Sequence, residues 1–128
     1  MLSRFFCVFL LLIGLDLINS ISRTTINQAP RLMSMRPNQE ENLNRKIKFI
    51  CLVQQGTLPF KFEWFLNGSK LLLENERSHP LKIEIANDES TLTIAKLAKN
   101  DTGTYSCRVQ NRYGFDQQST NLFVKGSI

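Results

Sequence analysis

The chain has 128 residues, with 16 Lys or Arg against 11 Asp or Glu, so its formal net charge is +5. This length favours one small domain, and one histidine with three cysteines is a poor inventory for a metal centre or for catalysis. The positive charge favours acidic partners such as anionic glycans, but no aromatic stripe interleaves the basic residues as nucleic-acid binding requires. We therefore expect no enzyme activity, no cofactor and no nucleic-acid partner.

The first segment, residues 5–15, is apolar and follows a single basic residue. It is too short to cross a bilayer as a helix and is typical of a secretory signal peptide. Ser20 and Ser22 are small and offer cleavage points. We predict a signal peptide over residues 1–22 and one domain over residues 23–128; an uncleaved anchor is the alternative.

Cleavage would remove Cys7 and leave Cys51 and Cys107. Thiols outside the cell are not kept reduced, so we expect these two to form a disulfide. Closing so large a loop stabilises a fold by about 4 kcal/mol on the chain-entropy model. No second long apolar run follows, so we expect a secreted domain with no membrane span, standing alone or opening a longer cell-surface receptor.

Alternating apolar and polar residues, interrupted by turn residues, predict an all-β sandwich. A strand is expected within residues 30–35, before Pro37. The clearest strand is 47–53, in which Phe49 lies on the same side as Cys51. Further strands are expected at 60–64, 70–73, 81–85, 90–94, 105–109 and 118–124, with a tight hairpin at Asn67-Gly68.

The spacing of three residue types indicates the kind of sandwich. Trp64 follows Cys51 by thirteen residues, and Tyr105 precedes Cys107 by two. An immunoglobulin-like sandwich has one cysteine on each sheet, a tryptophan against their bridge, and a tyrosine whose hydroxyl bonds to backbone upstream. We predict this two-sheet, all-β fold with one inter-sheet disulfide. The expected scaffold residues are Trp64, Leu92, Asp101, Gly103 and Tyr105.

Four further motifs accompany this spacing: Gly56-Thr-Leu-Pro59, Trp64-Phe-Leu-Asn-Gly68, Ser90-Thr-Leu-Thr-Ile94 and Asn111-x-x-Gly114. Through them the chain resembles intermediate-set (I-set) immunoglobulin domains, most of all those of the Down syndrome cell adhesion molecule (Dscam) family. That resemblance implies homophilic recognition between cell surfaces through strand faces. It departs from the family in one respect, because Dscam proteins string many domains together and span the membrane.

Two sequons, Asn67-Gly-Ser69 and Asn100-Asp-Thr102, lie in predicted turns. Secretion would expose both to the glycosylation machinery, so both asparagines are candidate N-glycosylation sites. Asn100 is the less favourable of the two because it adjoins the motif around Tyr105.

The residues of 46–52 that point away from Cys51 are two lysines followed by two apolar residues: Lys46, Lys48, Ile50 and Leu52. An exposed apolar pair on a sheet is a candidate protein interface. The alternative is that the N-terminal strand covers Ile50 and Leu52. On the opposite sheet Phe65 is a second candidate, with Phe123 outward and Tyr113 and Phe115 near a turn.

The function we expect is protein recognition by homophilic cell adhesion of the Dscam type. The alternative is a secreted immune-type factor that binds microbial or host anionic glycans through its basic surface, where Arg45, Lys46 and Lys48 cluster. A purely structural spacer is the third reading.

Overall fold

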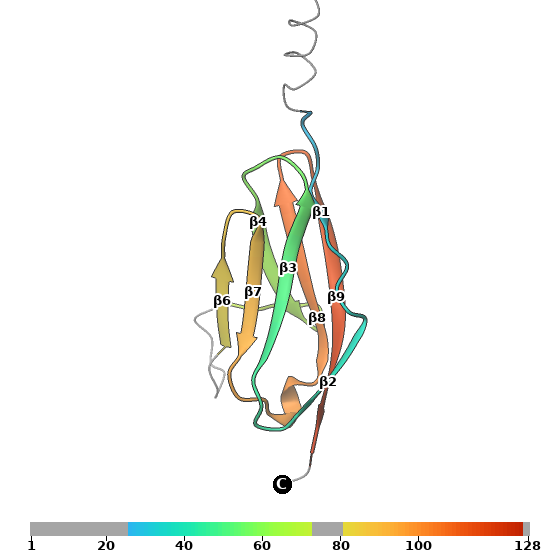
Figure 1. The fold of residues 1–128 in the computed structure, drawn as a ribbon, viewed down its shortest axis with the longest axis vertical. Coiled ribbons are helices and arrows are strands. Elements are labelled where there is room, and N and C mark those ends of the chain that lie inside the picture. The colour runs from blue at the N-terminus through green and yellow to red at the C-terminus, as the bar shows by residue number, and fades with distance from the viewer. Residues whose placement is uncertain (1–25, 73–80, 127–128) are drawn as a thin grey trace, which may run out of the picture.

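The computed structural model describes residues 26–72 and 81–126, and the predicted signal peptide lies outside them. The described chain forms two β-sheets packed face to face, as Figure 1 shows, which confirms the predicted fold class. One sheet has the order β1-β3-β7-β6 and the other the order β2-β9-β8-β4-β5. The strands are β1 (Arg31–Leu32), β2 (Asn38–Asn42), β3 (Ile47–Gln55), β4 (Lys61–Leu66), β5 (Ser69–Lys70), β6 (Leu81–Ile85), β7 (Glu89–Ile94), β8 (Gly103–Asn111) and β9 (Gly114–Lys125).

The interior between the sheets is apolar and crossed by one covalent link. The disulfide joins Cys51 of β3 to Cys107 of β8. Trp64 is almost completely buried, and its indole Nε1 donates a hydrogen bond of 2.9 Å to Ser90 Oγ. The Ser90 hydroxyl in turn donates to the backbone oxygen of Glu84 at 3.0 Å. This chain of bonds pairs each of these polar groups, which would otherwise be costly to bury.

The corner before β8 is held by the residues of the Asp101–Tyr105 motif. The Tyr105 hydroxyl donates to the backbone oxygen of Asp101 at 2.6 Å, and the Asp101 carboxylate accepts from the backbone N–H of Ala98 at 2.8 Å. A Cβ on Gly103 would lie 2.8 Å from both Asn67 Oδ1 and Leu66 Cδ1. A larger residue there would have to displace these two side chains of β4 and the β4–β5 turn.

The strand β2 was missed by the sequence-based prediction, which expected a single strand ended by Pro37. The structure has β1 in one sheet and, after Pro37, β2 in the other, parallel to β9. Each of the five residues of β2 is polar, so hydrophobic alternation provided no signal. A polar sequence suits an edge strand, which must not invite pairing with other chains. In the same sheet β9 is longer than expected, and β5 is limited to Ser69–Lys70.

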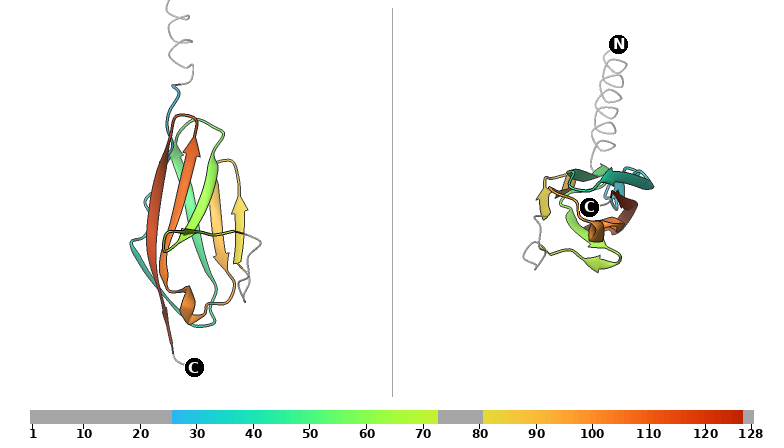
Figure 2. Two further views of the ribbon diagram at one scale, coloured as in Figure 1. Left: turned by 180° about the vertical axis from the view of Figure 1, so that it is seen from behind. Right: turned by 90° about the horizontal axis from the view of Figure 1, so that it is seen from below.

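Different segments of the chain lie at the two ends of the sandwich (Figures 1 and 2). One end contains the N-terminal arm, the β3–β4 loop, the β6–β7 turn and the β8–β9 turn. The other end contains the 3₁₀ helix Lys99–Asp101 and the C-terminal end of β9. Within residues 26–72 and 81–126, no helix is long and apolar enough to cross a membrane.

Candidate recognition faces

The outer face of the four-stranded sheet is formed by alternate residues of β3, β7 and β6. Ile50 pairs across the strands with Thr91, which in turn pairs with Glu84. The next row contains Lys48, Thr93 and Lys82. Because successive side chains alternate between the two sides of a sheet, all six point away from the disulfide.

Three apolar side chains gather at the β1 edge of this face. Ile50 is 57% exposed and Met33 is 47% exposed. Leu52 is half-buried, and its backbone oxygen accepts a 2.8 Å hydrogen bond from the N–H of Met33. We call Met33, Ile50 and Leu52 the apolar patch. The alternative that the N-terminal strand covers Ile50 and Leu52 is wrong for Ile50, because β1 pairs only with Val53 and Gln55 and ends before reaching it. It holds in part for Leu52, which is half-buried beside Met33.

The rest of this face is polar, and its side chains make few interactions with one another. Thr93 is only 7% exposed, yet its hydroxyl has no hydrogen-bond partner within the described residues. Lys82 Nζ lies 3.0 Å from the Glu84 carboxylate. This hydrogen bond, and after it the charge of Lys82, lowers the pKa of Glu84 below its usual value. Both side chains are well exposed, so the pair contributes little to folding.

The five-stranded sheet presents a different outer face. Phe65 is half-buried beside Lys70 of β5, its cross-strand neighbour. Phe115 and Phe123 are exposed, but they are eight positions apart along one strand, or about 26 Å. The aromatic residues predicted as a second interface therefore do not form a continuous apolar surface.

Polar groups on this face largely engage one another. The Glu63 carboxylate lies 2.9 Å from Lys70 Nζ and 3.9 Å from Lys61 Nζ, and the hydrogen bond from Lys70 is the main cause that lowers the pKa of Glu63. The guanidinium of Arg108 lies 4.1 Å from the ring centre of Phe115, although its Nε has no hydrogen-bond partner among residues 26–72 and 81–126.

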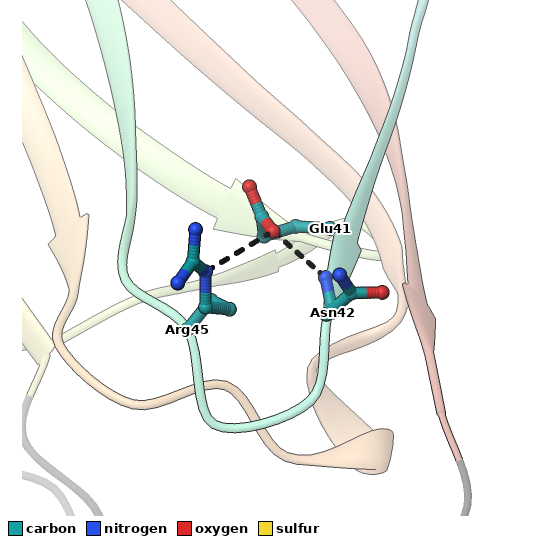
Figure 3. Close-up of polar contacts among 3 residues, drawn as sticks. All are labelled: Glu41, Asn42 and Arg45. Carbon is teal, nitrogen blue, oxygen red and sulfur yellow. Dashed lines mark hydrogen bonds and ion pairs between the residues drawn. The ribbon is translucent and has the colours of Figure 1, made fainter.

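The basic cluster predicted from the sequence is partly neutralised. Arg45 Nε lies 3.9 Å from a carboxylate oxygen of Glu41, and the same oxygen accepts a 2.9 Å hydrogen bond from the backbone N–H of Asn42, as Figure 3 shows. Lys46 and Lys48 are exposed nearby. Among the residues that the structure describes, no three His, Cys, Asp or Glu side chains gather as metal ligands would.

Both sequon asparagines are exposed, and their modification stays a prediction. Asn67 lies in the β4–β5 turn at φ 49°, and its Oδ1 accepts a 2.9 Å hydrogen bond from the N–H of Thr104. Asn100 lies in the 3₁₀ helix.

Comparisons with known proteins place this fold in a family. The immunoglobulin-domain family model matches residues 30–111. Myopalladin of Mus musculus is 31% identical over 101 residues, which are 79% of this chain and 7% of that protein. The membrane-bound isoform of pro-neuregulin-1 of Homo sapiens is 32% identical over 95 residues, which are 74% of this chain and 14% of that protein. The chain therefore spans a small part of these relatives.

Solved structures show the same likeness. Titin domain M4 has a TM-score of 0.68 at 25% identity, covering 79% of this chain and all of that one. The Dscam1 Ig7 domain, isoform 5, has a TM-score of 0.66 at 21% identity, covering 76% and 97%. Dscam is thus one of several structural neighbours, and at this identity the likeness is one of fold alone. The family match, the two-sheet sandwich and its disulfide establish that the chain belongs to the immunoglobulin-domain family.

Proposed function

We propose that the protein acts outside the cell in protein recognition, and that its partner is a second copy of the same domain. The contact surface is the outer face of the four-stranded sheet. The observation that carries this proposal is the apolar patch of Met33, Ile50 and Leu52, in which Met33 and Ile50 are exposed. Ile50 pairs across the strands with Thr91 in the centre of the face. Removing such surface from water contributes roughly 25 cal/mol for each Å² of apolar area.

The charges of the same face suit pairing by a two-fold axis. In such a contact each residue meets its counterpart reciprocally, so a face must complement itself. Lys82 and Glu84 lie side by side on β6 with opposite charge. An antiparallel copy would set each lysine against the partner's glutamate, which favours the correct register and disfavours other partners.

Two features support an extracellular location. A structural disulfide such as Cys51–Cys107 is typical of compartments where thiols are not kept reduced. The apolar run at residues 5–15 has the length and flanks of a secretory signal. Adhesion of the Dscam type is the specific form of recognition that we propose.

The test is whether beads coated with the mature, disulfide-bonded domain aggregate, because multivalent display reveals weak contacts between single domains. We expect the wild-type beads to cluster and to remain clustered at high salt, since apolar contact is not screened. The Ile50→Glu variant should not cluster, because pairing would bury its carboxylate against the apolar patch.

The matched control is Phe123→Glu, which places the same charge on the five-stranded face at a site 55% exposed. It should cluster as the wild type does. Circular dichroism checks that both variants fold. Folded Ile50→Glu beads that cluster normally would disprove the proposal, as would equal loss in both variants.

A further inference from the structure

The loops at the N-terminal end of the sandwich are tied together by one side chain. Asn111 Nδ2 donates hydrogen bonds to the backbone oxygens of Gln28 at 2.7 Å and Thr57 at 2.9 Å. Its Oδ1 accepts from the N–H of Tyr113 at 2.9 Å. One amide thus joins the N-terminal arm, the β3–β4 loop and the β8–β9 turn, whose convergence is visible in Figure 1.

The arm is also packed closely against the two loops. Gln28 and Thr57 bond to each other twice, through Gln28 N to Thr57 Oγ1 at 2.9 Å and Thr57 N to Gln28 O at 3.1 Å. Gly56 has φ +140°, and a Cβ there would lie 2.7 Å from Pro30 Cα. The surface of this end is therefore held in place before any ligand arrives, which lowers the entropic cost of binding.

Two shallow hollows adjoin each other on this surface. One, of about 380 Å³, is lined by two basic residues, and the other, of about 350 Å³, is lined by no charged residue. They share Pro59 and Phe60 as a common wall. The basic hollow is also lined by Lys61, Gln110, Asn111 and Arg112, and the uncharged one by Leu58, Ile85, Ala86 and Asn87.

The charges of the basic hollow are available to an anion. No acidic residue lines it, and within the described part of the chain no carboxylate lies in ion-pair distance of Arg112. The guanidinium of Arg112 lies 5.6 Å from the ring centre of Tyr113, an arrangement that consumes none of its five N–H donors. Lys61 Nζ is 3.9 Å from Glu63, beyond hydrogen-bond distance, so its donors are free for a ligand.

We propose that this end of the domain binds an acidic oligosaccharide. A carboxylate or sulfate group lies between Lys61 and Arg112, where charge-assisted hydrogen bonds hold it. The apolar side of the neighbouring sugar ring lies on Pro59 and Phe60, and the amide of Gln110 bonds to sugar hydroxyls. Hollows that are shallow, partly apolar and edged by a few polar groups suit sugar rings in this way. None of these residues belongs to the apolar patch, so the inference is independent of self-recognition.

The test measures binding of the mature domain to three probes by calorimetry: a heparin hexasaccharide, a hyaluronan hexasaccharide and neutral maltohexaose. We expect at least one acidic probe to bind and maltohexaose not to bind. Binding of heparin alone identifies sulfate as the recognised group, whereas binding of hyaluronan as well shows that a carboxylate suffices.

The site is tested by the double variant Lys61→Ala, Arg112→Ala, which should weaken binding by about tenfold or more. Its matched control is Lys96→Ala, Lys99→Ala, which removes the same charge from two exposed residues outside both hollows. The control should change affinity by less than about threefold, as expected when only long-range, salt-screened attraction is lost. Equal losses in the two variants, maltohexaose binding as tightly as the acidic probes, or no binding of either acidic probe would overturn the inference.

Discussion

The outer faces of the two sheets differ in how many of their side chains already interact with other side chains of the domain. On the five-stranded sheet Glu63 is paired with Lys70 at 2.9 Å, Arg108 lies over Phe115, and the hydroxyls of Ser106 and Ser119 are 2.7 Å apart. On the four-stranded sheet Lys82 and Glu84 form one ion pair, and Met33 and Ile50 of the apolar patch are exposed. A side chain that is already bonded gains little from a partner, so the second face has more to gain by association.

The difference originates at the edges of the sheets. In the five-stranded sheet β9 is flanked by the five-residue β2, and β5 lies beside Phe65. In the four-stranded sheet β1 is only two residues long, so within the described residues most of β3 has no paired strand on that side. The edge of β3 beside Ile50 is therefore open, whereas Phe123 of β9 is flanked by Glu40 of β2.

The largest effect is expected from removing the disulfide, because it joins the two sheets and its loss would destabilise both outer faces together. The double variant Cys51→Ala, Cys107→Ala should lose about 4 kcal/mol of stability, a large share of the 5–15 kcal/mol typical of a domain. Urea denaturation followed by tryptophan fluorescence measures it through the buried Trp64. An unchanged midpoint would show that packing alone holds the sheets together.

A smaller effect is expected from removing the buried hydrogen bond between Trp64 of the five-stranded sheet and Ser90 of the four-stranded sheet. Ser90→Ala removes the acceptor of Trp64 Nε1 and leaves this buried indole N–H without its protein partner. We expect a loss of about 1–3 kcal/mol in the free energy of unfolding. The matched control is Ser119→Ala on the exposed five-stranded face, where water can replace the lost bond and the cost should be under about 1 kcal/mol. Equal losses of stability in the two variants would contradict the prediction that the buried hydrogen bond contributes more than the exposed one.

The smallest effect concerns the five-stranded face alone and depends on pH. Because the hydrogen bond from Lys70 lowers the pKa of Glu63 below its ordinary value, the ionised pair stabilises the folded state at pH above that ordinary value. This contribution is lost as the pH falls through the folded-state pKa. Glu63→Gln should therefore lose less stability on acidification than the wild type, by under about 1 kcal/mol. Lys70→Met should reduce the pH dependence of the free energy of unfolding in the same way. If that free energy changes with pH in either variant as it does in the wild type, the Glu63–Lys70 pair does not stabilise the folded state.

Much of the fold could be predicted because its signals are local. The alternation in residues 81–85 matches β6 residue for residue, and residues 47–53 all fall within β3. The tight hairpin predicted at Asn67-Gly68 has positive φ at both positions. In contrast β2 escaped prediction, because a strand of polar residues is stabilised by its parallel pairing with β9 and not by any pattern of its own.

The candidate sites were less predictable for the same physical reason. Parity correctly predicted that Ile50 and Leu52 point outward, but it could not predict that Ile50 is open and Leu52 half-buried. Nor could it place Met33 beside Leu52, since that depends on the register of β1. Asn111 was recognised only as part of a turn motif, although its amide joins three segments that lie far apart in the chain.

The sequence by itself determined the architecture: an immunoglobulin sandwich, its disulfide between Cys51 and Cys107, and the inward or outward parity of most strands. These follow from alternation and spacing, which are properties of neighbouring residues. Only the tertiary structure decided which outward residues are exposed, which charges are neutralised, and that Lys61 and Arg112 line one hollow. Exposure and electrostatic environment depend on segments distant in the chain, and only folding brings those segments together.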